Sequence, residues 1–201
     1  MGRQLCSPLY VNLRNRVSSL ASHFLPEESD PLGNYSDNQQ IDASACVLLT
    51  HAEVETYLEG LSRKLGAVAL AQIEEACYSE LSSAFLFAAG SDKKVLKGNP
   101  SSLENASKAF LGIRNEQINA NNGIKENNLN SLFSPFSLTD VRFSDDLIPA
   151  LNSFGALRGR CAHTSAIGTK KIIDCYEIRT QINDLLDLLK EFDSIYSKWV
   201  I

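Results

Sequence analysis

Hydrophobic residues near the C-terminus recur at spacings that alternate between four and three. The repeat lies within residues 176–201 and comprises Ile178, Ile182, Leu185, Leu189, Phe192, Tyr196 and Trp199. Side chains with this spacing lie on one face of an α-helix, because the helix turns once every 3.6 residues. The pattern therefore predicts a long amphipathic helix packed against another helix.

Two earlier segments repeat the same spacing. Within residues 51–76, the apolar positions are Val54, Leu58, Leu61, Leu65 and Val68. Near the N-terminus they are Leu13, Val17, Leu20 and Phe24. Pro26 follows the second set and should end that helix, because proline cannot continue the helical hydrogen-bond pattern. Both segments are predicted to be helical.

Residues 101–163 show shorter helical signals. Ser101 and Glu104 have the spacing of a capping box and predict a helix from about residue 101 to 119. The Asn-rich stretch around Gly123 predicts a turn and then a short helix that ends at Pro135. A further helix should begin just before Pro149, a residue that only the first turn tolerates. Its apolar positions are Leu147, Leu151, Phe154 and Leu157.

The segments between these helices are polar and contain Pro and Gly. Residues 26–40 and 90–100 are predicted to be solvated loops. No segment alternates apolar and polar residues for long enough to build a sheet. The sequence therefore predicts an all-α bundle of about five or six helices, with residues 1–201 forming a single domain. The expected core includes Val54, Leu58, Leu61, Leu185, Leu189 and Phe192.

Composition limits the function classes. The chain has 201 residues, of which 44% are hydrophobic, and its net charge of -5 argues against coating nucleic acid through bulk charge. A local basic patch on an acidic protein can still bind phosphates. Five cysteines without a CxxC pair indicate free thiols, and three scattered histidines do not suggest a zinc site. With no signal peptide and no long apolar run, we expect a soluble cytoplasmic protein without membrane contact.

The segment RGRCAHTS, residues 158–165, carries the candidate chemistry. Arg158 follows Phe154 by four residues and Leu151 by seven, so it should flank the apolar stripe and lie against a neighbouring helix or a second copy. His163 lies five residues further on. A purely structural interpretation is that Arg158 pairs with a carboxylate and His163 stabilises the helix end.

The same segment resembles the R-x(4–6)-H signature of the HEPN superfamily of helical nucleotide-binding and ribonuclease domains. Arg158 and His163 occupy its two fixed positions. Residues 42–61 are similar to the family's early helix, which has an acid two residues before an aromatic, here Glu55 and Tyr57. Residues 121–138 resemble the Gly-Ile-Lys segment of the branch called RiboL-PSP-HEPN. The resemblance covers roughly residues 42–199 and implies a HEPN-like helical bundle.

For this chain, the resemblance implies a metal-independent endoribonuclease without a cofactor. The family forms homodimers in which two motif helices face each other, so Arg158 and His163 of both copies would act together on RNA. Arg160, Thr164, Lys170 and Lys171 would hold the RNA backbone, although the two lysines could equally belong to an ordinary solvated loop. The resemblance also suggests a toxin or antiviral defence effector, with a cognate antitoxin or another defence protein as a partner.

Two positions depart from the family pattern and keep alternatives open. Gly159 stands where many active members have Asn, Asp or His, which favours a catalytically inactive dimerisation or partner-binding module. Ser165 stands where members paired with a nucleotidyltransferase antitoxin have tyrosine. A small-molecule nucleotide binder is a third class, but no Gly-rich phosphate loop is visible. His51 and Glu55 could face the cleft, although the sequence favours a hydrogen-bonded pair in the core.

Overall fold

The computed structural model describes residues 6–27, 30, 34–137, 143–163 and 174–200. These residues contain eight α-helices, one short 3-10 turn and no strand, so the predicted all-α class is confirmed. In chain order the helices are α1 (Pro8–Phe24), α2 (Asp37–Glu74), α3 (Glu80–Ser91), α4 (Lys93–Lys97), α5 (Leu103–Asn119), α6 (Glu126–Phe133), α7 (Leu147–His163) and α8 (Cys175–Val200), with the 3-10 turn η1 (Ser134–Phe136) after α6.

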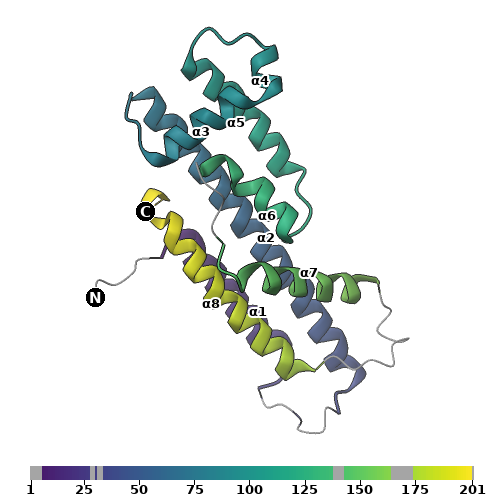
Figure 1. Cartoon of the computed structure of the whole chain (residues 1–201). Helices are drawn as coiled ribbons and strands as arrows, with labels where there is room; N and C mark the ends of the chain where they lie inside the picture. Colours follow the sequence, from purple (N-terminus) through teal and green to yellow (C-terminus); the bar gives the residue numbers. More distant parts are fainter. Residues whose placement is uncertain (1–5, 28–29, 31–33, 138–142, 164–173, 201) are drawn as a thin grey trace.

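The long helix α2 organises the fold. Its 38 residues span about 57 Å at the usual helical rise. Figure 1 shows α1, α7 and α8 around one half of α2 and α3, α5 and α6 around the other, with α4 beyond α3 and α5. One continuous hydrophobic cluster joins side chains from these helices. The six residues predicted for the core are all buried: Val54, Leu58, Leu61, Leu185, Leu189 and Phe192.

Three local predictions need correction. The stretch 90–100 is not simply a loop, because Asp92 accepts hydrogen bonds from the backbone N–H groups of Lys94 and Val95 and starts α4. The loop 26–40 ends earlier than predicted, since Ser36 caps α2. The cap of α5 is Ser102 rather than Ser101. Helix α3 was not predicted either. With α3 and α4, the described residues contain eight helices instead of the expected five or six.

Helices α1 and α8 are joined by polar contacts at both ends of α1. At its N-terminus, the backbone N–H of Ser7 donates to Asp193 Oδ2 at 2.7 Å and its hydroxyl donates to Oδ1 at 2.5 Å. At its C-terminus, the Arg179 guanidinium donates to the carbonyls of Leu25 and Pro26 at 3.1 and 3.0 Å. These bonds satisfy backbone groups that a helix end leaves without partners. All five cysteines are free, as predicted.

Candidate active site

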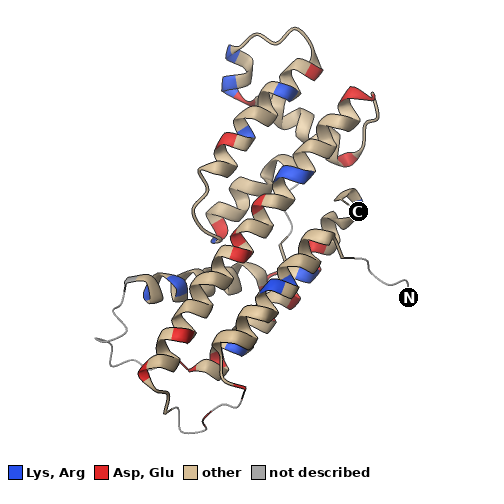
Figure 2. Ribbon diagram, turned by 180° about the vertical axis from the view of Figure 1, so that it is seen from behind, with Lys and Arg blue, Asp and Glu red and all other residues tan. Residues whose placement is uncertain are grey.

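Helix α7 carries the predicted motif in its last turns. Leu147, Leu151, Phe154 and Leu157 are buried along one face, as the sequence predicted. Arg158 is half-buried beside that face, and Arg160 is exposed. His163 is the last residue of the helix. The basic residues of α7 therefore lie together at its C-terminal end (Figure 2).

Arg158 lies near His51 of α2. Only 6% of His51 is exposed. Burial and the neighbouring positive charge of Arg158 lower the pKa of His51 to about 4, so its ring is neutral at pH 7. Among the described residues, no carboxylate forms an ion pair with Arg158. The carboxylate partner proposed by the purely structural interpretation is thus not found within the described part of the chain.

The lowered pKa of His51 predicts a loss of stability in mild acid. The unfolded chain binds this proton near pH 6.5 and the folded chain only near pH 4, so stability falls as the pH drops through this window. We expect His51 to account for a loss of about 2–3 kcal/mol between pH 7 and pH 4. Urea unfolding of wild type and His51→Gln at several pH values measures this contribution.

The exposed His23 provides a matched control for this experiment. His23→Gln should lose stability in parallel with wild type, whereas His51→Gln should show a shallower pH dependence. If the free energy of unfolding changed with pH in the same way for all three proteins, the lowered pKa of His51 would be contradicted.

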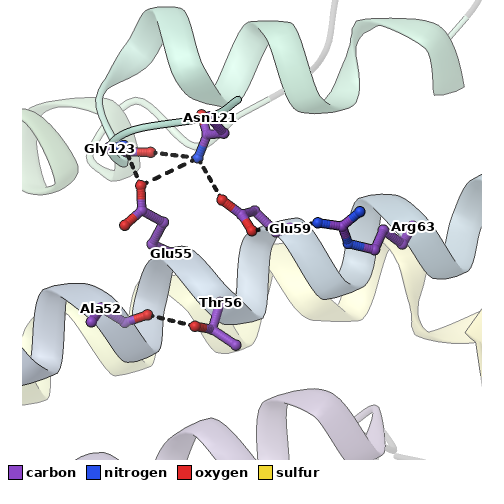
Figure 3. Close-up of polar contacts among 7 residues, drawn as sticks. All are labelled: Ala52, Glu55, Thr56, Glu59, Arg63, Asn121 and Gly123. Carbon is purple, nitrogen blue, oxygen red and sulfur yellow. Dashed lines mark hydrogen bonds and ion pairs between the residues drawn. The ribbon is translucent and has the colours of Figure 1, made fainter. Parts of the chain in front are cut away.

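Glu55 anchors the loop between α5 and α6 (Figure 3). Its carboxylate accepts a hydrogen bond from the backbone N–H of Gly123, and Asn121 Nδ2 donates to it at 3.4 Å. The same Nδ2 group donates to Glu59 Oε1 at 3.0 Å and to the carbonyl of Gly123 at 3.1 Å. Gly123 has a φ of +134°, a conformation that residues with a side chain rarely adopt. The predicted pairing of Glu55 with His51 is therefore wrong, because the carboxylate holds the loop instead.

The same loop packs on α7. Ile124 is fully buried, and the backbone N–H of Glu126 donates to Asn152 Oδ1 of α7 at 3.1 Å. This bond gives an acceptor to one of the backbone N–H groups at the start of α6, whose N-cap residue Lys125 makes no side-chain capping bond. The Gly-Ile-Lys segment thus contacts both the early helix, through Glu55, and the motif helix.

Tyr57 lies on the side of α2 opposite to Glu55 and has a structural role. Its hydroxyl donates to Asp193 Oδ1 at 3.0 Å, and 3% of the residue is exposed. Burial and the Asp193 carboxylate raise the pKa of Tyr57 well above 10, which keeps the hydroxyl protonated as a donor. Tyr57, the aromatic residue of the early-helix pattern, therefore stabilises the core rather than the candidate site.

The described residues include only part of the predicted RNA-binding set. Arg160 is present on α7, whereas Thr164, Lys170 and Lys171 lie outside the described residues. Sequence reasoning missed Asn152, which stands three residues before Gly155 on α7 and fixes the loop. It also missed Asp193, whose position between Phe192 and Tyr196 in the apolar repeat was an available signal for a buried carboxylate.

Within the described ranges, no three His, Cys, Asp or Glu side chains are grouped to hold a metal ion, and no helix is long and apolar enough to cross a membrane. A family model described as RiboL-PSP-HEPN matches residues 11–198. Searches of curated proteins and of solved structures found no match. The matched range includes the early helix, the loop and the motif helix, the three parts that the structure brings into contact.

Proposed function

Because the chain belongs to the RiboL-PSP-HEPN family, we propose that it is a metal-independent endoribonuclease in which Arg158 and His163 act on RNA. The observation that carries the proposal is the charge of Arg158. The guanidinium is half-buried at the end of α7, beside a neutral histidine and without an ion-pair partner among the described carboxylates. Such a group is suited to bind a phosphate, because its planar fork matches two phosphate oxygens.

The reaction uses the RNA's own 2'-hydroxyl as the nucleophile. The 2'-oxygen loses its proton to a base and attacks the adjacent phosphorus, and the bond from phosphorus to the 5'-oxygen breaks as an acid protonates that oxygen. Arg158 would stabilise the negative charge that develops on the phosphorane. An imidazole can serve as base or acid near neutral pH, which is the role proposed for His163.

A second copy of the chain would complete the proposed site. A single imidazole cannot act as base and acid in the same step. The motif helices of two copies would therefore contribute two histidines and two arginines to one site. Arg158 flanks the buried face of α7, a position that could meet a second copy. Arg160, Thr164, Lys170 and Lys171 would then bind RNA phosphates along the cleft.

The chemistry can be tested with purified wild-type protein. In excess EDTA, it should cut single-stranded RNA and leave 2',3'-cyclic phosphate and 5'-hydroxyl ends, because the attacking oxygen belongs to the RNA. Mass spectrometry of the fragments identifies both ends. Products with 3'-hydroxyl and 5'-phosphate ends, or a strict requirement for added metal, would contradict the mechanism.

Gly159 favours one alternative function. A Cβ atom added at this position would meet no atom within 4 Å in the described part of the chain, which leaves room for a side chain of a partner. A HEPN-like module that dimerises or binds a partner without cleaving RNA could use this surface. Lack of cleavage over a broad panel of RNAs would favour this module. For the ribonuclease, a role as a toxin or defence effector, with a cognate antitoxin or another defence protein as a partner, is part of the proposal.

A further inference from the structure

The side chain of Lys125 crosses helix α7 at Gly155. A Cβ atom at Gly155 would lie 3.1 Å from both Cγ and Cε of Lys125 and 3.7 Å from its Cδ. Contacts of 3.1 Å are tighter than nearly all contacts of real Cβ atoms, so any larger residue would push the lysine aside. The glycine therefore provides the space in which the aliphatic part of Lys125 rests on the helix.

The backbone on both sides of Lys125 is held in place. Gly123 is bonded to Glu55 of α2, and Glu126 is bonded to Asn152 of α7. Ile124, between them, is fully buried. A lysine on a free loop loses much of its conformational freedom when it binds a ligand, whereas a lysine held in this way has already lost part of it.

The ammonium group of Lys125 extends from a point on α7 that is one helical turn from Arg158. It is bonded to Cε, which lies against Gly155, and Gly155 and Arg158 are three residues apart on one face of α7. Lys125 is exposed and forms no ion pair with a carboxylate in the described ranges. Next to Arg158, a Cβ atom at Gly159 would meet no described atom within 4 Å. Two cationic side chains from different elements thus lie about one helical turn apart along the motif helix.

We propose that Lys125 binds a backbone phosphate of the RNA next to the one held by Arg158. The inference rests on the proposed function, because it identifies a further contact to the same substrate. A second phosphate contact would fix the direction of the strand along α7 and place the scissile phosphate near the helix end. Lys125 would then contribute to affinity and to positioning, with no part in proton transfer.

Binding can be measured separately from cleavage with a fluorescent single-stranded 2'-O-methyl RNA, whose blocked 2'-oxygen cannot attack. In fluorescence anisotropy, Lys125→Gln should weaken binding by about 5- to 10-fold and reduce the slope of log affinity against log salt by about 0.7, the value for one lost contact to a single strand. Lys125→Arg should restore most of the affinity. Lys93→Gln provides the matched control, since Lys93 is an exposed lysine of α4, away from α7 (Figure 1).

Cleavage assays on unmodified RNA then separate the two proposals. If wild type cleaves RNA but Lys125→Gln and Lys93→Gln bind it equally well, the lysine contact is wrong and the ribonuclease proposal stands. If wild type does not bind the 2'-O-methyl RNA at all, the lysine contact is again wrong, and the end groups of the cleavage products decide the ribonuclease proposal. Weaker binding of Lys125→Gln alone, with the salt slope reduced, supports the inference even if no cleavage is seen.

Discussion

Replacing His163 with alanine should slow RNA cleavage by about 100-fold or more, the usual effect of losing a general acid or base. The variant keeps Arg158 and the other cationic groups, so RNA affinity should change little. Single-turnover cleavage of a labelled RNA measures the chemical step. His23→Ala is the matched control, because His23 is exposed on α1 and has no role in the proposed reaction.

Arg158→Ala should have a comparable effect through a different cause, the loss of phosphorane stabilisation. Both variants must keep the mass of the wild-type protein in light scattering and its helical circular dichroism. Full activity of His163→Ala would remove the catalytic assignment. If the wild-type protein stays monomeric at micromolar concentration, with and without RNA, the proposed site with two imidazoles is wrong.

Asp193→Ala should destabilise the protein by about 3–5 kcal/mol. The carboxylate is fully buried and accepts three hydrogen bonds, two from Ser7 and one from Tyr57. Alanine would leave these buried donors without an acceptor, and each such group costs about 1–3 kcal/mol. Chemical unfolding followed by circular dichroism gives the difference in free energy.

Two further variants make this measurement specific. Tyr57→Phe removes one donor and leaves the carboxylate with two, so it should cost only about 1–2 kcal/mol. Asp184→Ala removes an exposed carboxylate from the same helix and should change stability by less than about 0.5 kcal/mol. A cost for Asp193→Ala as small as that for Asp184→Ala would show that the buried network contributes little.

The hydrophobic period predicted the long helices because it reports directly on which face is buried. Leu185, Leu189 and Phe192 are buried for this reason, and the same reasoning placed Leu58 and Leu61 in the core. The start of α2 could also have been predicted from the sequence, since Ser36 and Gln39 have the spacing of a capping box and form one in the structure. That capping box was missed because residues 26–40 were interpreted only by their Pro, Gly and acidic content.

The candidate site was predictable in its residue types but not in its contacts. The spacing of Arg158 and Leu151 placed the arginine beside the apolar face, as the structure shows. Its neighbour His51 comes from a helix more than a hundred residues earlier, and no local pattern reports such a contact. The hydrogen bond between Gly123 and Glu55 could not be predicted for the same reason, because it depends on where the α5–α6 loop packs.

The bonds between Ser7 and Asp193 have a consequence for synthesis of the chain. They join residues 186 positions apart, so α1 lacks these partners until α8 has been translated. Arg179 likewise reaches the end of α1 from α8. Contacts this distant in sequence form late, and apolar surface stays exposed until they do. The nascent protein should therefore depend on the 26-residue helix α8 to close the core, so loss of α8 should destabilise α1 as well, although the two helices lie at opposite ends of the described chain.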